Sequence, residues 1–268
     1  MKIKMIVSDL DGTLLREDKS ISEHTKSVLN KCRQAGIKVV YATGRGGSAN
    51  ERAPAALFDG RISMNGAIAI VGDKMIYNPL VPYQLGKPVL IACDKRNLKT
   101  TSEAVDGKHY SNFDVIDEWP SLFESKFEIV DFEQHNIDAA KLYAVVNTPE
   151  DAAYIQENLP PELYLTVSRD GLAQVMHKDA TKSKAIAELA KLWRIDSSEI
   201  AAFGDDLNDL DMLDYAGYGV AMGNAVDDVK TACDFECGCN DEDGLAKWIE
   251  TNVLHLVVDD SDIGLSSQ

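Results

Sequence analysis

The chain has 268 residues, of which 45% are hydrophobic, and a formal net charge of −17 at pH 7. This length allows one large domain or a core with a smaller insertion, and the apolar content suffices for a buried core. The acidic balance excludes binding to nucleic acid through a basic surface, because no lysine or arginine cluster offsets the negative field. A small phosphorylated anion is not excluded, since local cations or a metal set the potential inside a cleft.

The cysteines and the first residues predict a cytoplasmic protein. The chain has five cysteines, an odd number that does not suit a disulfide framework. We see no secretory leader, and no stretch approaches the roughly 20 apolar residues of a membrane span. Cys233, Cys237 and Cys239 lack a fourth ligand at zinc-finger spacing, which favours ordinary packing or surface thiols. We therefore expect neither a membrane nor nucleic acid as a partner, and the oligomeric state is left open.

Strand and helix patterns alternate at the start of the chain. Residues 3–7 form an apolar run, residues 22–35 have helical spacing with Ser22 as N-cap and Gly36 past the end, and residues 37–42 form a second apolar run. After a second helix-like stretch, residues 62–77 read as short strands broken at two turn-forming pairs, Asn65-Gly66 and Gly72-Asp73. This order is typical of βαβ units.

The pattern changes between residues 82 and 177. Short strand candidates lie at residues 109–113, 127–131, 142–146, 163–167 and 172–176. A helix is expected to begin at Thr148, which is followed by a proline and two acidic residues. This mixture predicts an inserted α+β domain.

The alternating pattern then returns. Helices are expected at residues 181–193, 207–216, 226–233 and 242–254, strands at 200–203 and 218–222, and a capping box at Asp196 and Glu199. We therefore predict an α/β protein: residues 1–81 and 178–255 form an open, mostly parallel, Rossmann-like core, and residues 82–177 form an α+β cap. The acidic residues 256–268 are expected to be a flexible tail.

Two carboxylates end the first apolar run. Asp9 and Asp11 belong to the segment Asp-Leu-Asp-Gly-Thr, and two like charges about 4 Å apart repel by roughly 1 to 4 kcal/mol. They would ionise together only beside a metal or an ammonium group, and oxygen ligands favour Mg²⁺. The alternative is a simple turn, because Asp and Gly are common loop residues.

Further polar residues follow two other apolar runs. Thr43 and Gly44 come after the second run, and Asp205, Asn208 and Asp209 come at the end of the run at 200–203 or soon after it. In an open parallel sheet ligands bind at the carboxyl ends of the strands, so we expect these residues to meet there. Each segment alone also fits a loop or a solvated helix start.

Lys182 completes the charge balance. A lysine at the start of a helix is unfavourable for the helix dipole, but it is well placed to meet a phosphate. Asp9, Asp11, Asp205 and Asp209 contribute four negative charges, and Mg²⁺ with Lys182 returns three positive ones. With further donors, such an arrangement suits phosphoryl transfer, in which positioning and charge neutralisation lower the barrier.

Together these segments resemble the haloacid dehalogenase-like superfamily, and within it the Cof-like sugar-phosphate phosphatases, which carry a large cap after the third core strand. The resemblance covers nearly the whole chain. It rests on six segments in order: residues 5–15, 39–45, Lys182, 204–209, Met222-Gly223-Asn224-Ala225 and residues 240–244.

The resemblance implies a role for each residue. Asp9 is the nucleophile that forms an aspartyl-phosphate, and Asp11 protonates the leaving oxygen and then activates water. Mg²⁺ is held by Asp9, by the backbone carbonyl of Asp11 and by Asp205, with Asp209 behind these ligands. The residues expected to contact phosphate are Leu10 through its amide, Thr43, Gly44, Lys182 and Asn208.

The expected function is therefore Mg²⁺-dependent hydrolysis of small phosphorylated metabolites, with sugar phosphates as the expected substrates. A phosphosugar mutase would use the same Asp9 and Asp11, and a phosphometabolite sensor would need no nucleophile beside a proton donor. A dehalogenase is disfavoured because its chemistry needs no Mg²⁺ cluster. Gly46-Gly47 stands where this family often has proline after Thr-Gly-Arg, and Asp206 adds charge near the site. Tyr110, Asn112, Asp170 and His177 are left without a role.

Overall fold

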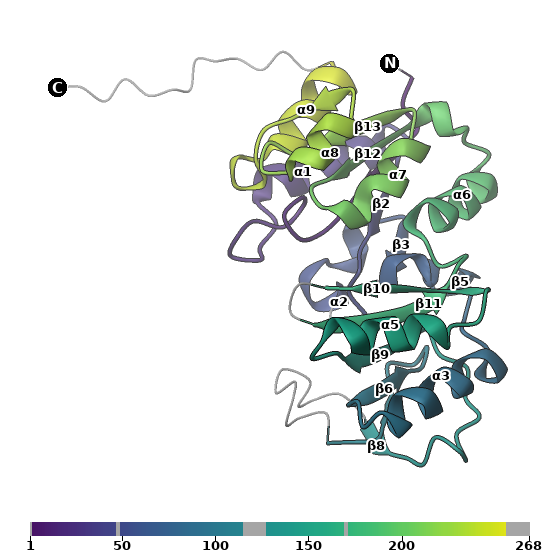
Figure 1. Ribbon diagram of the computed structural model, residues 1–268. Helices are drawn as coiled ribbons and strands as arrows, with labels where there is room; N and C mark the ends of the chain where they lie inside the picture. The colour runs from purple at the N-terminus through teal and green to yellow at the C-terminus, as the bar shows by residue number, and fades with distance from the viewer. Residues whose placement is uncertain (1, 47–48, 115–126, 169–170, 256–268) are drawn as a thin grey trace.

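The computed structural model describes residues 2–46, 49–114, 127–168 and 171–255. These residues form two sheets, one above the other in Figure 1. The fold class predicted from the sequence is confirmed. The predicted tail at residues 256–268 and Gly47 lie outside the described residues.

The core sheet has eight strands in the order β14-β13-β12-β1-β2-β3-β4-β5. The strands from β14 to β3 are parallel, and β4 and β5 add an antiparallel edge. Their bounds are β1 Met5–Ser8, β2 Lys38–Ala42, β3 Gly60–Ser63, β4 Ile68–Val71, β5 Lys74–Tyr77, β12 Ile200–Gly204, β13 Tyr218–Ala221 and β14 Phe235–Glu236. Every residue of β1 and β12 is buried, as expected for central strands covered on both faces.

Helices pack on this sheet in neighbouring pairs, α1 beside α9 and α6 beside α7. Their bounds are α1 Glu23–Gln34, α2 Ala49–Arg52, α6 Lys182–Trp193, α7 Leu210–Tyr215, α8 Asp227–Ala232 and α9 Gly244–Asn252. Ser22 caps α1 by accepting from the Thr25 amide, as the sequence predicts. Thr181 caps α6 in the same way, which fixes the point at which Lys182 enters the helix. None of the helices in the described part is long and apolar enough to cross a bilayer.

The cap sheet has six strands in the order β10-β11-β9-β6-β7-β8. They are β6 Thr100–Glu103, β7 His109–Ser111, β8 Phe127–Ile129, β9 Lys141–Val145, β10 Leu163–Val167 and β11 Leu172–His177. The helices α3 Tyr83–Lys95 and α5 Pro149–Glu157 pack on it. Thr148 is the N-cap of α5, as the sequence predicts, and it forms a capping box with Asp151 that was not predicted. The exact division between core and cap stays a prediction.

Two local expectations are wrong, and one strand was not predicted. The helix expected at residues 207–216 is split, because a 3-10 turn at Leu207–Asp209 precedes α7. The helix-like stretch after β2 is reduced to one turn of α2 and a 3-10 turn at Ala55–Leu57. Strand β6 was missed, because its sequence Thr-Thr-Ser-Glu has no apolar alternation.

Candidate active site

Sheet topology brings the predicted residues together. Asp9 follows β1, Thr43 follows β2 and Asp205 follows β12, and these three strands are neighbours in the order β12-β1-β2. All three run parallel, so the residues after them lie at one edge of the sheet. A pocket of about 400 Å³ at this edge is lined by Asp9, Asp11, Gly12, Thr43, Gly44, Arg45, Asp205, Asp206 and Asn208.

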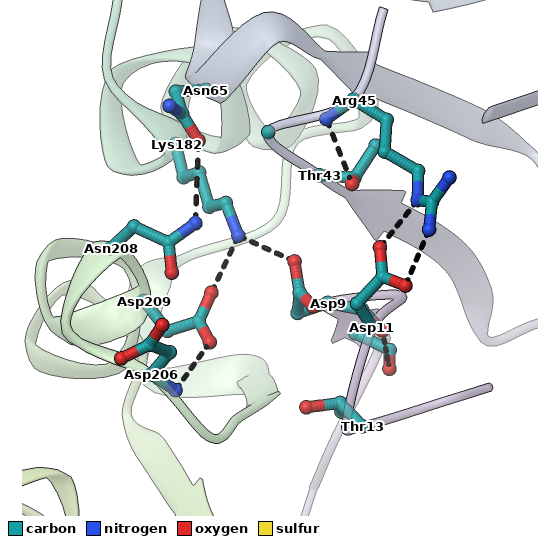
Figure 2. Close-up of polar contacts among 12 residues, drawn as sticks. Asp9, Asp11, Thr13, Thr43, Arg45, Asn65, Lys182, Asp206, Asn208 and Asp209 are labelled. Carbon is teal, nitrogen blue, oxygen red and sulfur yellow. Dashed lines mark hydrogen bonds and ion pairs between the residues drawn. The ribbon is translucent and has the colours of Figure 1, made fainter. Parts of the chain in front are cut away.

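The buried ammonium of Lys182 joins two carboxylates in this site. Its Nζ donates to Asp9 Oδ1 at 2.6 Å and to Asp209 Oδ1 at 2.5 Å, as Figure 2 shows. Burial alone would lower the pKa of Lys182, but Asp9 and Asp209 outweigh burial and raise it. Lys182 is therefore a permanent cation with one positive charge for two carboxylates.

Asp205 and Asp209 are held by their own hydrogen bonds. Thr13 Oγ1 donates to Asp205 Oδ1 at 2.7 Å, while Asp209 Oδ2 accepts from the amides of Asp205 and Asp206 at 2.9 and 3.1 Å. The 3-10 turn that starts at Asp206 points these amides at Asp209. The 3-10 turn that interrupts the expected helix therefore fixes the Asp209 carboxylate next to the end of β12.

Asp9, Asp205 and Asp209 form a cluster that fits a hard cation. One carboxylate oxygen from each lies within 4.8 Å of the others. Burial raises the pKa of Asp9 to about 8 despite Lys182, and burial raises the pKa of Asp205 to about 6. A site built only of oxygen ligands, with excess negative charge, is typical of Mg²⁺ or a similar divalent ion.

Asp11 lies in the same pocket but points toward a different partner. Arg45 donates to Asp11 from Nε and, at 2.7 Å, from Nη2 (Figure 2). Lys19 Nζ also donates to Asp11, at 3.2 Å. The hydrogen bonds from Arg45 lower the pKa of Asp11. Sequence reasoning gave Arg45 no role, although it belongs to the Thr-Gly-Arg segment that was singled out.

The predicted phosphate contacts lie around the pocket. Thr43 is buried and its hydroxyl accepts from the Arg45 amide at 3.1 Å. Asn208 donates to Asn65 Oδ1 at 3.4 Å, which places its amide beside Lys182 in Figure 2. The Leu10 side chain is fully buried, so only its backbone can reach a phosphate. Their roles stay predictions.

Two asparagines support the loop that carries the acids. Asn224 Nδ2 donates to the Gly12 carbonyl at 2.7 Å, and Asn240 Nδ2 donates to the Leu15 carbonyl at 2.9 Å. The Asn240 amide also donates to Asn224 Oδ1 at 3.0 Å. This chain of bonds gives a physical reason for the last two sequence signatures, because both brace the segment between Asp9 and Leu15.

A larger cleft of about 1100 Å³ adjoins the pocket and extends to the cap. Its walls include Gly44, Lys182 and Asp205 from the core and Tyr164, Thr166 and Gln174 from the cap. Tyr110, Asn112 and His177 do not line it, and Asp170 lies outside the described residues. The cysteines at 233, 237 and 239 form no metal group in the part of the chain that the structure covers.

Comparison with known proteins gives a consistent result. The family model described as haloacid dehalogenase-like hydrolase matches residues 6–249. The phosphatase YwpJ of Bacillus subtilis is 28% identical, over 92% of this chain and 99% of its own. A haloacid dehalogenase-like hydrolase from Bacteroides thetaiotaomicron superposes with a TM-score of 0.80 at 26% identity, covering 93% of this chain and 99% of that one.

A solved subclass IIB sugar phosphatase superposes with a TM-score of 0.77 at 28% identity, covering 92% of this chain and 98% of that one. The resemblance noted in the sequence is therefore confirmed over most of the chain. Family, fold and clustered acids agree, and the chain belongs to the haloacid dehalogenase-like hydrolases as a phosphoric monoester hydrolase that acts on small phosphorylated molecules.

Proposed function

We propose that the protein is a Mg²⁺-dependent phosphatase that hydrolyses sugar phosphates and related small metabolites through an aspartyl-phosphate on Asp9. The observation that carries this proposal is the cluster of Asp9, Asp205 and Asp209 beside the buried ammonium of Lys182. The likeness to a solved sugar phosphatase supports the substrate class.

Asp9 and Asp205, with Asp209 behind them, would hold the metal, together with the Asp11 carbonyl. When bound, Mg²⁺ would neutralise the carboxylates and the phosphate oxygens, so that an anionic nucleophile can approach an anionic ester. Lys182 holds Asp9 in place through its 2.6 Å bond and adds a fixed positive charge next to the reacting oxygen. Thr43, Gly44 and Asn208 would orient the phosphate.

The covalent step uses the two acids of the first motif. A carboxylate oxygen of Asp9 forms a bond to phosphorus as the bond from phosphorus to the ester oxygen breaks, and Asp11 gives that oxygen a proton. Asp11 then takes a proton from the water that cleaves the aspartyl-phosphate, which regenerates both acids. Because Arg45 favours the ionised form of Asp11, the side chain must leave Arg45 before it can carry a proton.

The substitution Asp9→Asn tests this function. It keeps the size of the side chain but removes the nucleophile, so hydrolysis of p-nitrophenyl phosphate with Mg²⁺ should fall by at least about a thousandfold. Circular dichroism should show an unchanged fold. Hydrolysis at a near wild-type rate would disprove the assignment of Asp9, and release of isomerised sugar phosphate without free phosphate would favour a mutase.

A further inference from the structure

The cap contains a buried lysine that the proposed mechanism does not use. Lys141, at the start of β9, is 2% exposed. Its Nζ donates to Gln174 Oε1 at 3.0 Å and to the carbonyl of Gly44 at 3.4 Å, and it lies 5.4 Å from the centre of the Tyr143 ring. Among the described residues no carboxylate lies within 4.0 Å of it.

This environment is unfavourable for an ammonium. A buried cation is normally paired with a carboxylate, because neutral acceptors do not replace its hydration. Burial lowers the pKa of Lys141 to about 8, with a partial opposing effect of Glu103. Glu103 is itself bound by Tyr143, whose hydroxyl donates to Glu103 Oε2 at 2.6 Å. Burial of Lys141 without a carboxylate partner lowers the stability of the fold, which indicates that the residue has a task other than stabilisation.

The position of Lys141 suggests that task. Gly44 and Gln174 both line the cleft of about 1100 Å³ that also contains Lys182 and Asp205. An ammonium in contact with both residues lies directly behind the wall of this cleft, where the loop after β2, residues 43–46, meets the cap. Glu103 lies against the same loop, since a Cβ built on Gly46 would be 2.8 Å from its Oε1. The glycine that departs from the family pattern thus makes room for the cap.

We propose that Lys141 and Gln174 form the recognition site for the alcohol part of the substrate, and that they select esters with oxygen acceptors close to the phosphorylated carbon. This rests on the proposed phosphatase function. Lys141 already occupies Gln174 Oε1, so the amide nitrogen of Gln174 is the group that remains to donate into the cleft. The ammonium has three N–H donors, and it can exchange its long contact to the Gly44 carbonyl for a substrate oxygen.

The substitution Lys141→Met tests the proposal with matched esters. Glucose 6-phosphate offers hydroxyls, 3-phosphoglycerate offers a carboxylate, and p-nitrophenyl phosphate offers neither near its ester oxygen. We consider whichever of glucose 6-phosphate and 3-phosphoglycerate the wild-type protein hydrolyses with the higher kcat/KM. For this ester, kcat/KM should fall by about ten- to a hundredfold, mainly through KM, because a charge-assisted hydrogen bond is lost. For p-nitrophenyl phosphate the loss should stay below about threefold.

Binding provides a second measurement, without turnover. In an Asp9→Asn background, Lys141→Met should raise the Kd of the preferred ester by a similar factor, as measured by isothermal titration calorimetry. Gln174→Leu should produce the same selective loss, and it tests the proposal even if Lys141→Met does not fold. Lys108→Met is the control, because Lys108 lies in the same cap but pairs with Glu128, away from the cleft.

The possible results distinguish a failure of the recognition role of Lys141 and Gln174 from a failure of the proposed phosphatase function. Equal losses for all three esters would overturn the recognition role, since Lys141 would then act only on the loop after β2, through its contact with Gly44. No loss with any ester would overturn it as well. A wild-type protein that hydrolyses none of the three would instead contradict the proposed function.

Discussion

At the scale of single residues, the charge of the buried site is not balanced by the protein alone. Asp9, Asp205 and Asp209 bring three negative charges, and Lys182 returns one. A divalent cation would supply the missing two. Without it, protons must remain on the cluster, which agrees with the raised pKa values of Asp9, about 8, and Asp205, about 6.

Mg²⁺ binding should therefore release protons at neutral pH. A raised pKa means that the metal-free carboxyl still holds a proton at pH 7, and the metal needs that carboxyl ionised. We expect release of about one proton per Mg²⁺ at pH 7, and affinity that rises about ten- to twentyfold between pH 6 and pH 7 and levels off above pH 8. Isothermal titration in buffers of different ionisation enthalpy measures both. A binding enthalpy independent of the buffer at pH 7 would contradict the raised pKa of Asp9.

The sequence identified some of these residues and not others. Asp9 and Asp205 were recognisable because each ends an apolar strand, and strand ends meet by topology. The pairs Arg45 with Asp11 and Lys141 with Gln174 were not, because they depend on side-chain conformations and on how the cap meets the core. No spacing in the sequence marks Lys141.

At the scale of elements, one tight turn positions the helix that starts at Lys182. The turn Met64–Gly66 lies against the start of α6, and Gly66 has φ of +100°. A Cβ built on Gly66 would lie 2.0 Å from the carbonyl oxygen of Thr181, which caps α6. Only glycine allows this approach, so the turn and the helix start are fixed together.

Gly66→Ala should move the start of α6 and destabilise the protein. The strain of a positive φ and a clash with backbone that cannot rotate away should together cost about 3 kcal/mol or more, measured by urea unfolding. Because Lys182 would shift, hydrolysis should fall as well. Gly72→Ala is the matched control: Gly72 also has a positive φ, +58°, but a Cβ there meets nothing within 4 Å, so only about 1 kcal/mol is expected. Equal losses for both variants would rule out the contact as the cause.

Some helices and strands have clear local signals in the sequence, and others do not. Strands β1, β2 and β12 were found because their apolar runs are continuous. Helices α1 and α5 were found because their N-caps are explicit, and α6 because its apolar residues recur at helical spacing. Strand β6 has the sequence Thr-Thr-Ser-Glu, and its polar side chains are buried only because the cap sheet, a long-range assembly, surrounds them. Helix α3 carries Pro88 and Gly86 inside it, so its local signal is weak.

At the scale of the whole molecule, a strongly acidic protein is expected to act on an anionic substrate. The net charge of −17 opposes the approach of a phosphate dianion at long range, whereas inside the site a bound divalent cation would neutralise the acids that Lys182 and Arg45 leave unbalanced. The two effects have different ranges. At physiological ionic strength, salt screens the interactions of surface charges over distances longer than about 8 Å, whereas the contacts inside the site act over shorter distances.

Raising the ionic strength should therefore increase kcat/KM for phosphate esters. Between about 0.01 M and 0.15 M salt, the Debye length falls from about 30 Å to about 8 Å, which removes most of the long-range repulsion but leaves the contacts of Lys182 intact. At constant free Mg²⁺ we expect kcat/KM to rise about two- to fivefold and kcat to stay unchanged. The reason is that the repulsion acts on the encounter with the substrate and not on the bound ester. Steady-state rates with a dianionic ester over a potassium chloride series give the measurement. A fall in kcat/KM with salt would show that the cations of the cleft, and not the net charge of the molecule, govern the approach of substrate.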